Sequence, residues 1–194
     1  MVSSLLGIII DYAAHAIYLP VGYAILRLAG TANPKIRVLP SRANLKLFLL
    51  LSLILIFIEL IASLPGERGI SIFAAFGGPL FLALQLFFQG VIVGWTEEYL
   101  FRGCIQRVLN RRLKSLIASR IKSGTVLAAL IFGVFHFVNL ALGQSLLATI
   151  PQVIFATFFG LVVGWFYDRS NDFAGIAWIH NITDLAGTLL PFLV

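Results

Sequence analysis

Long apolar stretches separated by short polar connections make up most of this chain. Each stretch has about 20 residues, enough for an α-helix to cross a bilayer. We expect such spans near residues 4–28, 45–64, 79–101, 125–142, 146–167 and 173–194. The apolar runs are continuous and do not alternate with a period of two, which favours helices over a barrel. The pattern therefore predicts an all-α, polytopic membrane protein with a bundle of about six transmembrane helices.

The composition supports a membrane protein. Of the 194 residues, 60% are hydrophobic and only 11% are charged. Soluble domains contain about 45–50% apolar residues. Because each span takes about 20 residues and the connections are short, we expect one membrane domain over residues 1–194.

The basic residues explain the net charge of +6. All 14 lysines and arginines except Arg68 lie in or beside the first, third or fifth connection. Cytoplasmic loops are enriched in these residues, so we expect these connections in the cytoplasm and both termini outside. Short loops and the absence of targeting features indicate a prokaryotic plasma membrane.

The third connection, residues 102–122, mixes basic and apolar residues. This pattern predicts an amphipathic helix on the anionic cytoplasmic leaflet. No aromatic residues are interleaved with these charges. We therefore expect the bilayer, and no nucleic acid, as the partner of this segment.

Ionisable residues within three of the spans are the strongest functional signal, because charged groups in hydrocarbon are costly and need partners. Those that we select are Glu97, Glu98, Arg102, His136, His180 and Asp184. Counted along their helices, the glutamates and both histidines enter from the cytoplasmic side, so we expect one cavity open to the cytoplasm. Glu98 and Arg102 are four residues apart and can pair, which leaves Glu97 to face that cavity.

A glutamate and a histidine in such a cavity can hold and deprotonate a water molecule. Attack of that water on a peptide carbonyl is the obvious use, with a polar pair on a facing helix stabilising the oxyanion. Two histidines and a glutamate, here His136, His180 and Glu97, also form a ligand set of catalytic zinc. Since the chain has no HExxH helix, its sequence requires no metal, and we expect no cofactor.

Three motifs follow one another on separate spans: EExxxR at 97–102, FxxxH at 132–136 and HxxxD at 180–184. They resemble the motifs of the CPBP (Abi-type) intramembrane proteases, which include type II CAAX prenyl endopeptidases and bacteriocin-processing or self-immunity proteins. The resemblance covers residues 79–190 and implies a catalytic core there. Residues 1–78 then supply N-terminal transmembrane helices and loops.

The resemblance implies a glutamic-type endopeptidase that acts on a membrane-associated or lipidated protein or peptide. In this family's scheme, Glu97 activates water and His136 helps to hold it. Glu98 and Arg102 resemble the structural partners of the first motif.

His180 and Asp184 match the family's pair for oxyanion stabilisation. In the CAAX-processing branch the second position resembles asparagine, which can donate a hydrogen bond, whereas an ionised aspartate can only accept. Asp184 is therefore either protonated in its apolar surroundings, or it orients His180 and leaves donation to the imidazole. The difference also weakens any inference that the substrate is prenylated.

Other interpretations are open. A non-catalytic immunity protein would bind a peptide in the same cavity, and a transporter would use acids and histidines as a proton relay. Against transport, the sequence shows no inverted repeat. On the first span, Asp11 and His15 share a helix face; they form either a second polar site or an end-of-helix pair near the headgroups, and we favour the second interpretation.

Overall fold

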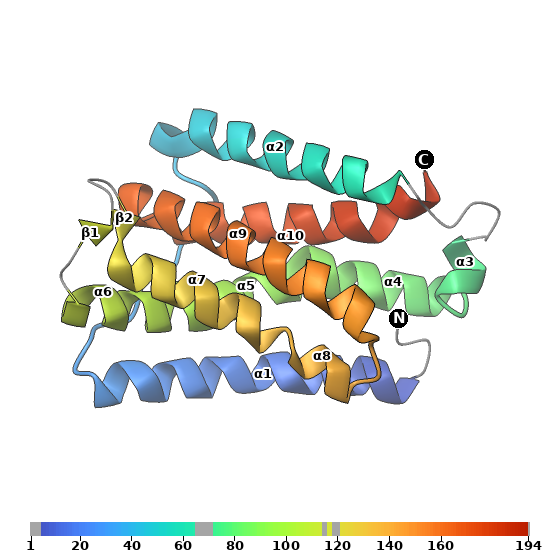
Figure 1. The fold of residues 1–194 in the computed structure, drawn as a ribbon, viewed down its shortest axis with the longest axis horizontal. Helices are drawn as coiled ribbons and strands as arrows, with labels where there is room; N and C mark the ends of the chain where they lie inside the picture. The colour runs from blue at the N-terminus through green and yellow to red at the C-terminus, as the bar shows by residue number, and fades with distance from the viewer. Residues whose placement is uncertain (1–4, 65–71, 114–115, 118–120, 194) are drawn as a thin grey trace. The chain divides into compact units, whose positions relative to one another are not determined.

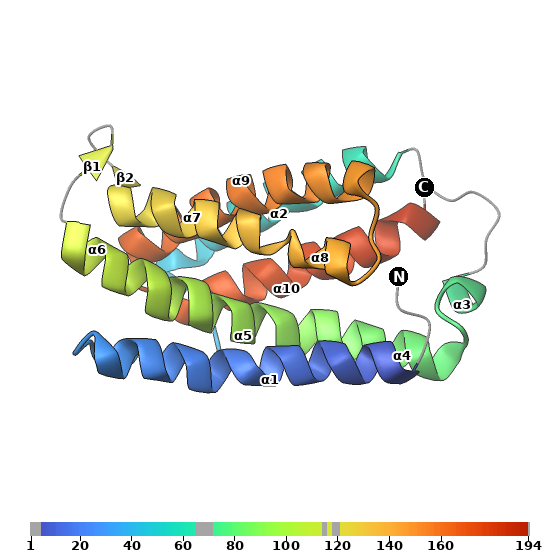
Figure 2. The same ribbon diagram turned by 60° about the horizontal axis from the view of Figure 1, so that its bottom comes forward.

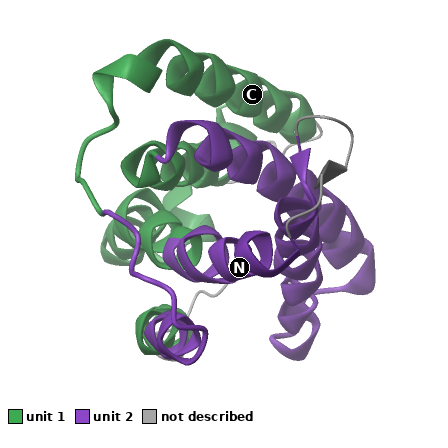
Figure 3. Cartoon of the chain, turned by 90° about the vertical axis from the view of Figure 1, so that its left-hand side faces the viewer, with its two compact units in different colours: residues 1–20, 36–98, 172–194 green, residues 21–35, 99–171 purple. Residues whose placement is uncertain are grey.

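The computed structural model describes residues 5–64, 72–113, 116–117 and 121–193. The chain divides into two compact units (Figure 3). Unit 1 comprises residues 1–20, 36–98 and 172–194, and unit 2 comprises residues 21–35 and 99–171.

The described residues contain five helices that are long and apolar enough to cross a membrane. They are Gly7–Leu28, Arg42–Ser63, Pro79–Leu113, Ser123–Ala141 and Leu146–Ser170. The sixth predicted span corresponds to α10 (Phe173–Leu189), which has 17 residues and is not among the five. The fold is therefore all-α and polytopic, as the apolar pattern predicts.

Unit 1 is built around α10, which packs against α2 (Leu45–Ser63) and α5 (Gly94–Glu98) (Figures 1 and 2). The unit also contains the short helices η1 (Arg42–Asn44), α3 (Ile72–Ala75), α4 (Pro79–Phe87) and η5 (Leu190–Phe192). In the connection between the second and third predicted spans, residues 65–71 lie outside the described residues.

The first half of α1 (Leu5–Leu28) also belongs to unit 1. It contacts α4 through Tyr12, whose hydroxyl donates a hydrogen bond to the carbonyl of Leu84 at 3.0 Å. At the start of α10, the Asp172 carboxylate caps the helix by accepting from the Gly175 amide at 3.1 Å. The same carboxylate accepts from the Ser41 amide at 2.7 Å, which ties the first connection to α10.

Unit 2 is built on two helices, α7 (Ser123–Phe135) and α9 (Leu146–Ser170), which pack along each other. The π-helical segment η3 (Tyr99–Gln106) and helix α6 (Arg107–Leu113) pack against α7. The remaining elements are α8 (Val138–Ala141) and an antiparallel pair of two-residue strands, β1 (Leu116–Ile117) and β2 (Ile121–Lys122).

The prediction of one amphipathic helix over residues 102–122 is wrong. The helix of the third span continues past residue 101 to Leu113, and the strand pair follows it. The polar residues of its first turns are buried, not exposed to headgroups: Arg102 and Gln106 are each 1% exposed. Gln106 finds a buried partner, because its amide donates to the Gly164 carbonyl at 3.0 Å. Lys114 and Arg120 lie outside the described residues.

Two π-helical segments interrupt the long helix on either side of α5. They are η2 (Phe88–Val93) and η3. Such wide turns are rare and occur frequently at functional sites. Directly after η2, the Gly94 amide donates to the side-chain oxygen of Asn181 on α10 at 2.7 Å. This bond fixes α5 against α10 next to the two glutamates.

We predict that Gly94→Ala lowers the free energy of unfolding by about 1–3 kcal/mol, as overpacking of a tight core does. A Cβ at position 94 would overlap the backbone carbonyl of Ala177 and lie 2.5 Å from the Asn181 side-chain oxygen. Gly90→Ala is the matched control, because a Cβ there meets only the end of the Leu185 side chain at 3.0 Å. Thermal unfolding of the purified variants in detergent measures both effects. Equal losses of stability would contradict the close approach at Gly94.

Candidate active site

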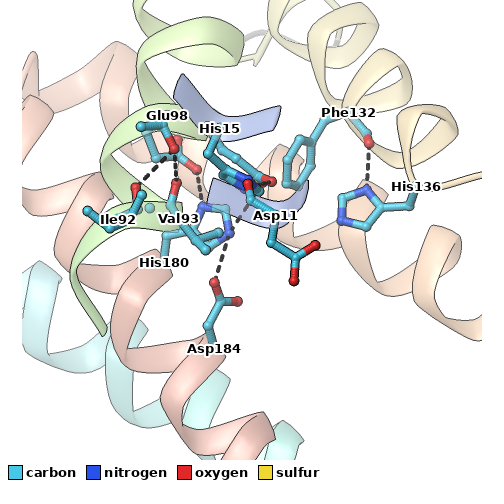
Figure 4. A network of polar contacts seen from close by, with 12 residues as sticks. Asp11, His15, Ile92, Val93, Glu98, Phe132, His136, His180 and Asp184 are labelled. Carbon is cyan, nitrogen blue, oxygen red and sulfur yellow. Dashed lines mark hydrogen bonds and ion pairs between the residues drawn. The ribbon is translucent and has the colours of Figure 1, made fainter. Parts of the chain in front are cut away.

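Four of the six selected residues lie together in unit 1. Glu97 and Glu98 end α5, and His180 and Asp184 lie one turn apart on α10 (Figure 4). The site is largely dry: Glu98 is fully buried, while Glu97 and His180 are 8% and 5% exposed. The packing of α5 on α10 thus brings the first and last motifs together, as the sequence predicts.

His180 is the hub of this cluster. Its Nδ1 lies 2.7 Å from Glu98 Oε1, and since an ionised carboxylate only accepts, Nδ1 is the donor. Its Nε2 faces Glu97 Oε2 at 3.7 Å and Asp184 Oδ2 at 3.6 Å. These two distances are within ion-pair range but are too long for hydrogen bonds. Glu98 therefore orients the ring, and Nε2 points toward the other two carboxylates.

A fifth ionisable side chain joins the cluster from α1. His15 Nε2 lies 3.2 Å from Glu97 Oε1, and His15 Nδ1 lies 2.8 Å from the backbone carbonyl of Asp11. The interpretation of Asp11 and His15 as an end-of-helix pair is therefore wrong. Spacing along α1 shows which residues share a face, but it contains no information about which helix that face meets.

The other two selected residues, Arg102 and His136, belong to unit 2. The Arg102 guanidinium carbon lies 4.3 Å from the centre of the Phe132 ring, a cation–π contact. His136 Nδ1 donates to the backbone carbonyl of the same Phe132 at 2.9 Å (Figure 4). In the neutral ring this leaves the lone pair on Nε2. Phe132 thus contacts residues of two motifs, Arg102 and His136. The pairing of Glu98 with Arg102 and the meeting of Glu97 with His136 stay predictions.

Within the part of the chain that the structure describes, no three His, Cys, Asp or Glu side chains form a group that could hold a metal ion. We therefore derive no step through zinc. The expectation that the protein needs no cofactor stays a prediction.

Residues 79–186, more than half of the chain, match the family model described as Type II CAAX prenyl endopeptidase Rce1-like. The chain belongs to this family. No curated protein and no solved structure matches the chain. Membership of the Rce1-like family confirms the resemblance drawn from the three motifs and identifies a CAAX-type intramembrane protease. The match contains all six selected residues, whereas α1 with His15 lies outside it.

For this Rce1-like protein we predict that Glu98→Ala lowers the free energy of unfolding by about 1–3 kcal/mol, because a buried donor on His180 loses its acceptor. Glu98→Gln is the matched control, since its amide oxygen can still accept from Nδ1. Thermal unfolding in detergent compares the two variants. If Glu98→Ala is as stable as the wild type, the orienting bond to His180 is not made.

Proposed function

We propose that the protein is an intramembrane endopeptidase that hydrolyses a peptide bond of a membrane-associated or lipidated protein or peptide. The observation that carries this proposal is the buried Glu97 beside His180, 3.7 Å apart, in a chain with the motifs of a protease family. A general base and a potential oxyanion donor are thus next to each other. Peptide hydrolysis by water needs both groups on one carbonyl.

In the proposed reaction, Glu97 removes a proton from water while the water oxygen bonds to the carbonyl carbon. The carbonyl electron pair moves onto the carbonyl oxygen, which becomes the oxyanion. The proton on Glu97 then passes to the amide nitrogen, the carbon–nitrogen bond breaks, and a carboxyl and an amino product form. His136 supports this step if its Nε2 accepts a hydrogen from the same water.

We assign stabilisation of the oxyanion to His180. Its Nδ1 already donates to Glu98, so donation from Nε2 requires a doubly protonated ring. The carboxylates of Glu98 and Asp184 compensate the positive charge of that ring. Of the two states open to Asp184, this arrangement supports the anion, which compensates the charge of His180 from 3.6 Å while Glu98 orients the ring.

We also propose that both termini lie outside and that the site opens to the cytoplasm. The distribution of basic residues supports this orientation. In unit 2, the third connection meets the first through Arg111, whose guanidinium donates to the Gly30 carbonyl at 2.6 Å. It meets the fifth connection through Lys122, whose amine lies 3.0 Å from the Asp168 carboxylate. Contacts among all three basic connections fit their placement on one side of a membrane.

We predict that Asp184→Asn lowers the rate of cleavage about 10-fold or more, since about 1.4 kcal/mol or more of transition-state stabilisation is lost with the charge. The neutral amide no longer compensates a protonated His180. Cleavage rates across a range of pH measure the effect. Undiminished activity at every pH would instead assign Asp184 the donor role.

We predict that Glu97→Gln abolishes proteolysis, because an amide cannot take a proton from water. The measurement compares peptide termini in membranes of cells that express wild-type protein or variant at equal levels. Termini found only with the wild type identify the substrate and the cleavage site. Glu59→Gln is the control, since Glu59 is a carboxylate of the same unit that packs against Gly187 of α10.

If wild-type and Glu97→Gln membranes have the same termini and the variant supports the same phenotype, the protein acts by binding a peptide, as a non-catalytic immunity protein would.

A further inference from the structure

The contact between His15 and Glu97 has no part in the reaction above. His15 lies on α1, outside residues 79–186, the part of the chain that matches the family model. Both are largely buried: counting side-chain atoms alone, His15 is 13% and Glu97 11% exposed. A buried imidazole on a catalytic carboxylate affects how that carboxylate is oriented.

The hydrogen bonds of His15 define its state. The Asp11 carbonyl can only accept, so His15 Nδ1, 2.8 Å away, carries a hydrogen. When Glu97 is ionised, as its role as the base requires, Nε2 carries the hydrogen of the bond to Glu97 Oε1, 3.2 Å away. This hydrogen bond holds Oε1 on the side of α1.

The His15 ring is itself held in place by aromatic neighbours. The edge of the ring meets Phe88 of η2, with 4.7 Å between ring centres, and Tyr18 lies 4.9 Å away. Tyr12, one turn earlier on α1, packs on Phe88 at 4.8 Å and donates to Leu84. These contacts restrict the rotamers of His15, so its Nε2 has a defined position.

The two carboxylate oxygens of Glu97 have different surroundings. Oε1 is bonded to His15, while Oε2 faces His180 Nε2 at 3.7 Å. Rotation of the carboxylate about its terminal torsion would exchange these oxygens, and such torsions are broad in an unrestrained side chain. The bond to His15 removes that freedom.

We propose that His15 is a positioning residue for proteolysis: it holds Oε1 of Glu97 so that Oε2 is the oxygen that takes the proton from water. This inference rests on the proposed role of Glu97 as the general base. It makes α1 a part of the active site, although the three motifs that resemble the family's lie on other helices.

The test uses the full-length protein in detergent and a quenched-fluorescent peptide that spans the cleavage site found in the comparison of termini. His15→Phe keeps a ring against Phe88 and Tyr18 but removes the hydrogen bond, and His15→Gln keeps a donor near the position of Nε2. We expect His15→Phe to lower kcat about 10–100-fold, as misplacement of a reacting group by about 1 Å does, with KM unchanged within about twofold. His15→Gln should recover most of the lost kcat. Tyr12→Phe is the structural control: it keeps the ring but loses the bond from α1 to Leu84 of α4, and we expect it to retain the wild-type kcat.

Wild-type kcat in His15→Phe, alongside an inactive Glu97→Gln, would overturn the positioning role and leave the proposed function intact. Equal losses in His15→Phe and His15→Gln, or an equal loss in Tyr12→Phe, would also overturn it, because the effect would then follow helix packing. Activity of Glu97→Gln would overturn the proposed function itself.

A second measurement is independent of activity and of how well the His15 variants fold. The chain has 3 histidines, so ¹⁵N-histidine NMR of the whole protein resolves each ring. We expect Glu97→Gln to shift the Nε2 signal of His15. An unshifted signal would overturn the proposal.

Discussion

The burial of two adjacent carboxylates in an apolar helix is the constraint on which the rest of the structure depends. A buried carboxylate is tolerated only with hydrogen bonds or opposite charge around it. Glu98, fully buried, receives a hydrogen bond from His180, and Glu97 receives one from His15. Three helices of unit 1, namely α1, α5 and α10, are therefore held together by the groups that make the site reactive.

The backbone around the glutamates is adapted to this requirement. A π-helical segment ends directly before Gly94, whose amide bonds to Asn181, and a second begins directly after Glu98. Without a side chain at Gly94, α10 approaches closely enough for His180 to reach Glu98. A regular α-helix of bulkier residues would keep these partners apart. The local irregularity and the chemistry of the site thus have one physical cause.

In unit 2, a single aromatic residue connects two motifs. The ring of Phe132 lies against the Arg102 guanidinium, and its backbone carbonyl orients His136. The phenylalanine of the FxxxH motif therefore does more than fill apolar space: its ring contacts Arg102 and its backbone carbonyl accepts a hydrogen bond from His136. The i, i+4 spacing of a helix places that carbonyl beneath the histidine ring.

The sequence by itself determined the class of fold and the approximate places of five spans, because continuous apolar runs are a property of local composition. It also singled out six residues, because ionisable interruptions of those runs are visible in the sequence alone. It failed where the outcome depends on which faces meet: the long helix continues to Leu113 with Gln106 buried against Gly164, and His15 reaches Glu97. Periodicity specifies the face of a helix, but only packing decides which partner that face meets, and so only the tertiary structure brought His15 of α1 to Glu97.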